Sequence, residues 1–574
     1  MNKTNFSMQN FRDQLASYEA LPQLVALGLI CGLGCGLLIA VFRLAIDLPL
    51  TLLLAEHVEN FEGLSLYQRF LYPSCGGLLL ALMYRYWPLI KNKVGIVHLL
   101  ERLAYHQGYI PLKNLCAQFI IAVVALVSGQ SVGREGPAIY MGASLSSLLG
   151  HWLHIPHNSQ RILVACGAAA AISAAFNTPL AGVIFAMEVI LLDYTIAGFT
   201  PIIVAAVCSS IVTRMIFSSE PVFDAPAFNI LSHAELPWVL LLGVLAGILG
   251  TFFIKLMLFT KSKIDWHLSY KLLLAGVLTG LVAIVQPEVM GTGYDTITDV
   301  FWDRLDLQLL LGILLAKILL TPIILGLGMP AGLIGPVLFI GAVMGAMFGI
   351  IGNLFIDSNV SVGLYAMLGM GAMMAAVLNA PLAALIALLE LTYNPNIIFP
   401  GMIAIVVANL TTRYVFNMPS AFLATLQAQG LDYRLEPLAQ ILNRASVAKV
   451  MSKSFQCSPT AISLHQAKTI ISQNAMWLVV TNNEQHTSAF PVMNIQSFLD
   501  RGIITIHDKI DLNRIPAQRF EVTTINLRAT LHEALQLMNS KETDLLCVYD
   551  HSSALAGLLT RAQIEHYYNN KQYL

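Results

Sequence analysis

Long apolar runs dominate the chain as far as residue 416, where charged and polar residues return. A run of about 20 apolar residues is long enough to cross a bilayer as a helix. We therefore predict an α-helical polytopic membrane protein with a more polar tail. The runs that predict ordinary spans are 21–52, 70–90, 197–217, 237–259, 271–285 and 307–327.

Two further apolar segments, 114–150 and 161–192, are interrupted by glycine, asparagine and proline. The first is broken at 129–137 and the second at 177–179. Broken backbone at membrane depth is tolerated only where protein buries it or where it lines a cavity. We therefore predict half-helices around a buried site rather than two further spans.

The first break carries an ionisable pair, because Arg134 and Glu135 are the only charged residues between Asn114 and Gly150. A carboxylate at mid-membrane costs about 2.5–3.5 kcal/mol on insertion scales, which makes it a candidate functional group. Pro137 is suited to the first turn of a helix. The free N–H groups and the dipole of such a helix start can bind an anion without a fixed cation.

The same pattern occurs twice. Gly332-Leu-Ile-Gly-Pro336 repeats Gly133-Arg-Glu-Gly-Pro137, and Leu378–Ala384 repeats Phe176–Gly182 at nearly the same offset. This indicates an internal duplication, with repeats of roughly 21–220 and 235–416. Duplicated halves with interrupted apolar segments are typical of transporters whose site lies between the repeats.

Composition supports this fold class. The 574 residues are 56% hydrophobic and 11% charged, and the formal net charge is −1, which gives no reason to expect nucleic acid as a partner. No Cys-x-x-Cys occurs, so we interpret the cysteines as small core residues without a metal or disulfide. Residues 1–20 lack the order of a cleaved signal and are expected to form an N-terminal cytoplasmic segment.

A predicted linker, 417–446, leads into a tail that is also duplicated, 447–574. Ser463–Ala467 matches Thr530–Ala534, and each copy begins with a capping box that predicts an amphipathic helix. These strand–helix–strand units resemble a tandem pair of CBS domains. An unrelated α/β cap is the alternative.

In CBS domains, adenosine nucleotides bind through a Thr or Ser and an Asp a few residues later. Here Thr560 remains, but Gln563 and Asn494 stand where acids would. The resemblance therefore leaves nucleotide binding as a hypothesis.

Gly133-Arg-Glu-Gly-Pro137 together with Asn177-x-Pro179 resembles one family specifically, the CLC chloride channels and chloride/proton antiporters. The resemblance implies two inverted repeats, a homodimer and one pore in each subunit. It also implies that Glu135 is the gate, displaced by an anion or released by protonation. Anions would be bound by backbone groups of Gly133, Arg134, Gly136, Gly332, Leu333 and Ile334.

Three positions depart from the family pattern. Val94 stands where the family has an anion-coordinating serine, and Ala421, with Phe422 beside it, stands where the family has a tyrosine. Neither Val94 nor Phe422 can donate a hydrogen bond from its side chain. Val189 replaces the glutamate that antiporters use to pass protons from the cytoplasm, so proton coupling would lose its usual relay.

Four other polar residues have structural and functional interpretations. Glu188 and Glu390 each follow a proline by nine residues, and we expect them to accept structural hydrogen bonds near a subunit interface rather than relay protons. Lys317 is interpreted as a snorkelling or paired charge. His98 has a pKa that could lie near neutrality, but a solvated histidine is expected there.

Three classes of function compete: passive anion conduction, proton-coupled exchange or export of a small anion, and a membrane enzyme. An intramembrane metalloprotease would need His-Glu-x-x-His, whereas His532-Glu533 lies in the tail without the second histidine, so we expect neither an enzyme nor a metal site. A divalent-cation transporter would need acidic groups along its pore. We therefore expect a chloride channel of the cell membrane, gated by voltage or pH, with its tail in the cytoplasm. The alternative is a chloride/proton antiporter or an exporter of another small anion such as fluoride.

Overall fold

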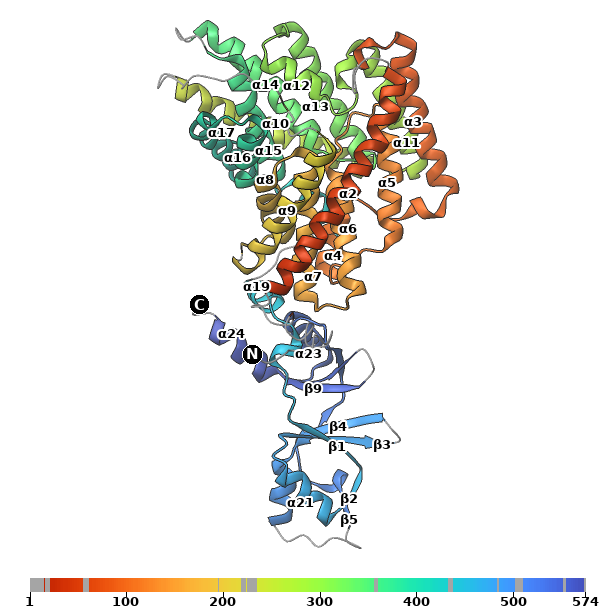
Figure 1. Cartoon of the computed structure of the whole chain (residues 1–574), viewed down its shortest axis with the longest axis vertical. Helices are drawn as coiled ribbons and strands as arrows, with labels where there is room; N and C mark the ends of the chain where they lie inside the picture. The colour runs from red at the N-terminus through yellow and green to blue at the C-terminus, as the bar shows by residue number, and fades with distance from the viewer. Residues whose placement is uncertain are drawn as a thin grey trace. The chain divides into compact units, whose positions relative to one another are not determined.

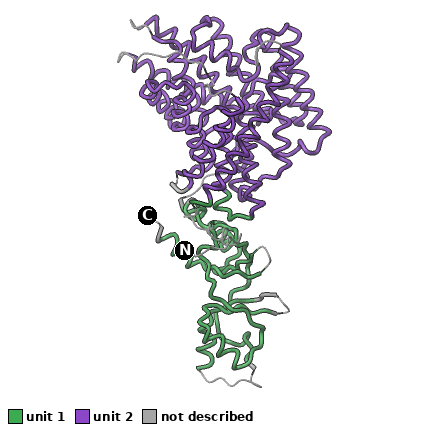
Figure 2. The backbone as a smooth tube through the Cα atoms, viewed as in Figure 1, with its two compact units in different colours: residues 1–23, 154–160, 434–574 green, residues 24–153, 161–433 purple. Residues whose placement is uncertain are grey.

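The described residues of the computed structural model form two compact units (Figure 2). The larger contains residues 24–153 and 161–433, and the smaller contains residues 1–23, 154–160 and 434–574. The structure describes residues 15, 21–54, 61–194, 196–217, 223, 235–355, 360–431, 437–482, 485–500, 509–550 and 554–571. The predicted N-terminal segment 1–20 therefore lies outside the described residues except for Leu15.

The larger unit is built from helices (Figure 1). Those of the first repeat are α2 (Leu21–Leu54), α3 (Leu66–Tyr86), α4 (Ile96–Tyr105), α5 (Leu112–Val127), α6 (Glu135–Trp152), α7 (His157–Phe176), α8 (Pro179–Phe185), a π-helical turn (Ala186–Leu191) and α9 (Ile196–Ile216). Those of the second are α10 (Leu236–Lys263), α11 (Leu268–Val285), α12 (Tyr294–Phe301), α13 (Leu307–Gly326), α14 (Ile334–Phe355), α15 (Val362–Leu378), α16 (Pro381–Thr392), α17 (Ile398–Leu410), a second π-helical turn (Thr411–Val415) and α18 (Ala421–Gln427).

Eight helical segments in the described part of the chain are long and apolar enough to cross a membrane. They are α2, α7, α9, α10, α11, α13, α14 and the segment Pro395–Val415. The prediction of a polytopic helical membrane protein is confirmed. Of the predicted spans, 70–90 corresponds to α3, which is not among the eight and contains Arg69 and Arg85.

The breaks predicted from glycine and proline are confirmed. In the first repeat, α5 ends at Val127 and α6 begins at Glu135, while α8 begins at Pro179, where a missing N–H costs nothing. In the second repeat, α14 begins at Ile334 and α16 at Pro381. Each repeat therefore contains two helices that start inside the apolar region.

Pairs of glycines bring neighbouring helices close together in both repeats. A Cβ atom at Gly142 of α6 would lie 2.3 Å from the carbonyl oxygen of Gly167 in α7. A Cβ atom at Gly341 of α14 would lie 2.4 Å from the carbonyl oxygen of Gly369 in α15. Small residues allow such close backbone packing between membrane helices. The contact between α6 and α7 in the first repeat is therefore equivalent to the contact between α14 and α15 in the second.

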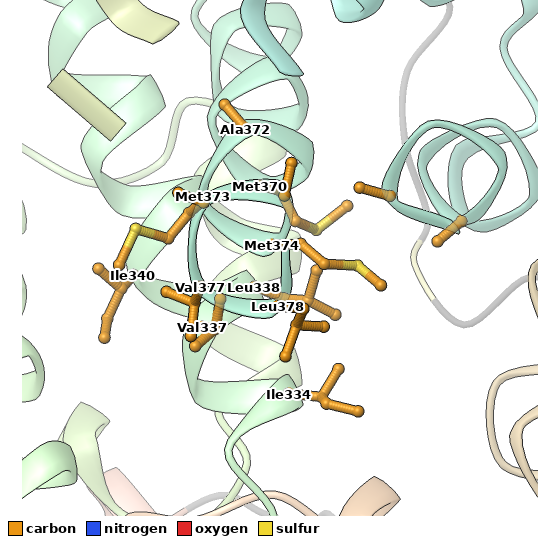
Figure 3. Packing of buried hydrophobic residues seen from close by; sticks show 14 of the residues in the cluster. Ile334, Val337, Leu338, Ile340, Met370, Ala372, Met373, Met374, Val377 and Leu378 are labelled. Carbon is orange, nitrogen blue, oxygen red and sulfur yellow. The ribbon is translucent and has the colours of Figure 1, made fainter. Parts of the chain in front are cut away.

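The largest hydrophobic core surrounds α14 and α15, where α15 buries every side chain and α14 buries all those from Ile334 to Ala346. Figure 3 shows residues of this cluster, among them Ile340 and Met373. Because α14 is buried nearly all round, its start is held by packing on several sides. The core therefore fixes the position of the second helix tip.

The smaller unit contains a short helix α19 (Pro437–Asn443) and two similar α/β halves. The first half contains α20 (Val447–Val450), β1 (Phe455–Pro459), β2 (Ala461–Ser463), α21 (Leu464–Ser472), β3 (Trp477–Asn482), β4 (Gln485–Pro491), α22 (Met493–Asp500), β5 (Lys509–Asp511) and β6 (Phe520–Glu521). The second contains β7 (Thr524–Asn526), α23 (Leu531–Lys541), β8 (Leu545–Tyr549), β9 (Leu555–Thr560) and α24 (Arg561–Lys571).

Both halves pair their strands in the same way. Strand β3 is parallel to β1 and antiparallel to β4, and β8 is parallel to β7 and antiparallel to β9. The predicted capping boxes are present at Ser463 with Gln466 and at Thr530 with Glu533. This small α/β unit is consistent with a CBS pair. The predicted linker 417–446 contains helices, because α18 and α19 lie within it.

Candidate functional site

The two Gly-x-x-Gly-Pro motifs meet at their first glycines. The N–H of Gly133 donates to the carbonyl oxygen of Gly332 at 2.7 Å, and the N–H of Gly332 donates back at 2.8 Å. The starts of α6 and α14 therefore lie side by side, although 199 residues separate these glycines in the sequence. The mutual bonds also correct one expectation, because each of these two N–H groups donates to the carbonyl oxygen of the other glycine rather than to an anion in this arrangement.

Glu135, the first residue of α6, is fully buried at this junction. Its Oε2 accepts a hydrogen bond of 3.0 Å from the N–H of Gly335, in the first turn of α14. A Cβ atom at Gly133 would lie 2.3 Å from the same oxygen, so a larger residue there would displace the carboxylate from this position. The carboxylate therefore occupies the positive end of a helix from the other repeat, where an anion would be stabilised.

A tyrosine that the sequence pattern did not single out also contacts the carboxylate. The hydroxyl of Tyr294, the first residue of α12, donates a hydrogen bond to Oε1 of Glu135. Tyr294 lies in the second repeat, in a segment for which no functional residue was predicted. The Gly291-Thr-Gly293 sequence before it was the one local signal of a special backbone conformation.

The predicted backbone ligands lie around the same junction. In the described part of the chain, the N–H groups of Leu333 and Ile334 show no hydrogen-bond acceptor, so both can serve an anion. The guanidinium of Arg134 lies 4.9 Å from the ring centre of Tyr294, a cation–π contact, and Arg134 is half-buried. Gly136 packs closely against the backbone of Gly332.

A cavity of about 590 Å³ opens next to these helix starts. Its wall includes Gly136, Gly332 and Leu333 from both helix tips. Its polar and charged lining residues are Tyr84, Lys93, His98, Glu101, Gln118, Lys261, Thr425 and Gln429. Lys93 forms an ion pair of 3.3 Å with Glu101, whereas no ion pair involving Lys261 occurs among the described residues. The wall of the cavity therefore contains a lysine side chain as well as the two helix tips.

Comparison with known proteins now identifies the family. A family model described as "Voltage gated chloride channel" matches residues 76–413, which is more than half of the chain. The chain belongs to the CLC family.

Two curated CLC proteins illustrate the relationship. A "Putative chloride channel protein ClcB-like" of Ralstonia nicotianae is 30% identical over 391 residues, covering 66% of this chain and 90% of that protein. The "H(+)/Cl(-) exchange transporter ClcA" of Vibrio cholerae is 32% identical over 316 residues, covering 53% of this chain and 68% of that protein.

Solved CLC structures share the fold. The structure of a slow cyanobacterial Cl−/H+ antiporter superposes with a TM-score of 0.63 at 24% identity, covering 71% of this chain and 97% of that one. A eukaryotic CLC transporter superposes with a TM-score of 0.61 at 18% identity, covering 95% of this chain and 99% of that one. The CLC fold predicted from the two motifs is thus confirmed.

The three positions that depart from the CLC pattern have different surroundings. Val94 lines the cavity, as does Phe422, whereas Ala421 is fully buried at the start of α18 and lies outside the cavity wall. Val189 is buried in the π-helical turn after α8 and packs into the main core. The cavity wall therefore has an apolar group at Val94, where the family pattern has a serine, and Phe422, next to the buried Ala421, is a second apolar group of the wall.

Glu188 and Glu390 cap helices of the opposite repeat. Glu188 accepts hydrogen bonds from the N–H groups of Leu382 (3.3 Å) and Ala383 (2.8 Å), at the start of α16. Glu390 accepts them from Leu180 (3.0 Å) and Ala181 (2.8 Å), at the start of α8. Both side chains thus accept structural hydrogen bonds and tie the two repeats together.

The structure contradicts the interpretation of His98 and the first half of the interpretation of Lys317, which was expected to snorkel or to be paired. His98 is buried rather than solvated, its Nδ1 lies 2.8 Å from the hydroxyl of Tyr140, and burial lowers its pKa to about 4. Lys317 does not snorkel, because its side chain is fully buried and its Nζ donates to the carbonyl oxygen of Val289 at 2.9 Å.

The remaining candidates are the cysteines, possible metal ligands and three residues of the tail. Among the cysteines interpreted as core residues, Cys75 and Cys457 are exposed. No group of three or more metal-binding side chains occurs among the described residues. In the tail, Thr560 and Gln563 bond each other at the start of α24, and Asn494 lies in the first turn of α22.

Proposed function

We propose that the chain exchanges chloride for protons across a membrane, with Glu135 as both the gate for chloride and the carrier of the proton. The observation that supports this most directly is the position of the Glu135 carboxylate, buried on the N–H of Gly335 between two helix starts. A side-chain anion already occupies the place where the peptide dipoles would stabilise chloride. The related ClcA, named as an H+/Cl− exchange transporter, supports exchange over passive conduction.

The geometry suggests how one group could serve both ions. Chloride entering from the cavity binds the N–H groups of Leu333 and Ile334, next to the N–H of Gly335 that the carboxylate occupies, and its charge displaces the carboxylate. Protonation removes the charge that the N–H of Gly335 binds, so the neutral side chain leaves this position. Because two negative charges at the same helix start repel each other, chloride occupancy and proton binding at Glu135 become linked.

Passive chloride conduction is the second candidate, and one observation favours it. Val189 is apolar and buried, so it cannot pass a proton between the cytoplasm and Glu135. Glu188 beside it is a weak substitute, because its two carboxylate oxygens bind backbone N–H groups of α16. Exchange therefore requires water in the cavity to carry the proton from the cytoplasm to the start of α6, where Pro137 forms part of the cavity wall.

A paired flux assay distinguishes the two functions. The full-length protein is reconstituted in liposomes, and chloride efflux and proton uptake are recorded together from the same sample. Exchange gives a fixed ratio of protons to chloride and pumps protons against a small pH gradient. Chloride efflux without proton movement would establish the channel, and Glu135→Gln provides the matched control in which exchange is expected to become uncoupled chloride flux.

We also propose that the protein lies in the cell membrane as a homodimer, with its tail in the cytoplasm. Basic residues at positions 85, 91, 93, 102 and 113 favour a cytoplasmic location for the α3–α5 connections. Leu180 and Leu382 are about half exposed beside the reciprocal glutamate caps, on helices that a second copy could cover. Light scattering in detergent should then give twice the chain mass of 62.6 kDa.

We propose further that the tail is a CBS pair and that the protein is not an enzyme. Its two halves share strand order and capping boxes, which supports a tandem origin. A tightly bound adenosine nucleotide is not expected, because the Thr560 hydroxyl is within 3.1 Å of Gln563 Oε1 and is already engaged.

A further inference from the structure

Tyr294 is held in one orientation by the groups around it. Its ring meets Phe223 edge-on with centres 5.3 Å apart, and Phe176 lies 6.3 Å away on another side. Arg134 adds its cation–π contact from the residue before the gate. Because Tyr294 is 9% exposed and packed by aromatic rings, its hydroxyl can point in few directions. The direction that it takes is toward Glu135.

The backbone that enters α12 is fixed to the helix that presents Gly335. Lys317 donates to the carbonyl oxygens of Val289 and Gly291, at 2.9 and 3.3 Å, and its Nζ lies 4.4 Å from the ring centre of Phe339 in α14. Gly293, with φ of 77°, turns the chain into α12, and a Cβ atom there would lie 2.5 Å from the Phe339 ring. The segment that carries Tyr294 and the helix that carries Gly335 are therefore packed against each other.

We propose that Tyr294 is a latch that holds Glu135 in the closed position and so sets the chloride concentration at which the gate opens. Tyr294 is a positioning residue in this proposal, which rests on the proposed role of Glu135. A phenolic O–H donates best to an ionised carboxylate. When chloride displaces the carboxylate, or a proton neutralises it, the latch bond is lost or weakened. The bond thus stabilises the closed state selectively over every open one.

The size of the effect follows from competition. A hydrogen bond to a charged group is worth about a tenfold change in an equilibrium constant, or somewhat more. If the site is mostly closed, the apparent dissociation constant of chloride equals the intrinsic constant divided by the fraction of molecules that are open. Removal of the latch should therefore lower the apparent dissociation constant of chloride about tenfold, and lower half-saturating chloride in flux assays to a similar degree.

The test compares chloride binding by four variants of the full-length protein in detergent, measured by calorimetry. Tyr294→Phe keeps the packed ring and removes only the hydroxyl, and it is expected to bind chloride about tenfold more tightly. In a Glu135→Ala background, which has no carboxylate to hold, Tyr294→Phe should change the affinity less than twofold. This double-mutant cycle isolates the coupling between the two side chains.

Tyr365→Phe is the matched control. Tyr365 is also fully buried, and its hydroxyl lies 3.5 Å from a carboxylate oxygen of Glu235, a residue that lines neither the gate nor the cavity. Its chloride affinity should equal that of the unmodified protein. Thermal unfolding of each variant shows whether the fold is kept.

The outcomes separate the latch from the proposed function. Equal affinity in Tyr294→Phe, weaker affinity, or the same change with and without the Glu135 carboxylate would overturn the latch. A weaker affinity would mean that Tyr294 binds the anion instead. The calorimetric test measures chloride binding in detergent and involves neither proton movement nor transport. Failure of proton coupling in liposomes would therefore count against exchange and not against the latch.

Discussion

The carboxylate of Glu188 accepts a hydrogen bond of 2.8 Å from the N–H of Ala383, a residue of the opposite repeat. Glu390 makes the equivalent bond to Ala181 in return. Each repeat thus caps a helix that it does not contain. The exposed N–H groups at the starts of α8 and α16 would otherwise face apolar surroundings without acceptors, which is costly.

Removing either cap is expected to lower the stability of the fold rather than to abolish the coupling of protons to chloride. Glu188→Ala should lower the free energy of unfolding by about 1–2 kcal/mol, because it leaves helix N–H groups without an acceptor. Glu390→Ala should have an effect of similar size, seen as a lower thermal midpoint in detergent. Asp299→Ala, which removes a solvent-exposed ion pair with Arg304, is the control and should change stability by less than about 0.5 kcal/mol. An unchanged midpoint with lost proton coupling would show that Glu188 relays protons.

The gate predicts a second result, at Glu135. Glu135→Gln removes the charge that the N–H of Gly335 binds, and Glu135→Ala removes the whole side chain. Both variants should still move chloride in liposomes, with proton movement reduced at least tenfold and little dependence on external pH, because the titrating group is gone. A folded Glu135→Ala that moves no chloride would rule out a gating role.

The apolar cavity wall predicts a third result, at Val94. Val94→Thr keeps the shape of the side chain and adds a hydroxyl that can donate to an anion in the cavity. Chloride binding should strengthen about threefold to tenfold, the value of one hydrogen bond to a charged group. Val94→Ala is the matched control, since it enlarges the cavity without adding a donor. Equal affinity in Val94→Thr and Val94→Ala would place the anion site away from this residue.

Burial of His98 predicts how stability depends on pH. Its pKa is lowered from 6.5 to about 4, so the unfolded chain binds the proton more readily than the folded one between those values. Stability from this residue is therefore present above about pH 6.5 and is lost as the pH falls toward 4, by up to about 3 kcal/mol. His98→Gln cannot titrate, so its thermal midpoint should fall less steeply with acid than that of the unmodified protein. Parallel curves would contradict the buried, neutral state of His98.

The helix breaks and the duplication were predictable from sequence because their causes are local. Pro137, Pro179 and Pro381 each lie in the first turn of a helix that starts within the apolar region. Proline restricts its own backbone and lacks an N–H, so it is well suited to the first turn of a helix. The neighbouring glycine or asparagine distinguishes these starts from prolines inside helices, such as Pro73 and Pro322. The duplication could then be recognised by comparing short segments, such as 133–137 with 332–336.

The contacts of the gate were harder to predict, because their partners are distant in sequence. Tyr294 bonds a carboxylate 159 residues away, and nothing in its own segment specifies that partner. The mutual bonds of Gly133 and Gly332 likewise appear only when the two repeats come together. For His98 and Lys317, the type of residue suggested exposure, and tertiary packing placed both in the interior.

The tail predicts a final result, with adenosine nucleotides. Thr560 and Gln563 form a reciprocal cap in which the Thr560 N–H donates to Gln563 Oε1 at 2.8 Å and the Gln563 N–H lies 3.3 Å from Thr560 Oγ1. A ribose would have to break this cap, and an amide offers a weaker acceptor than a carboxylate for its hydroxyls. Calorimetry of the full-length protein with ATP, ADP and AMP should therefore show no heat at millimolar ligand. Gln563→Asp keeps an acceptor in the cap and supplies the charge, so binding that appears only in this variant would identify residue 563 as the cause. Heat from the unmodified chain would instead mean that the nucleotide binds without an acid at this position.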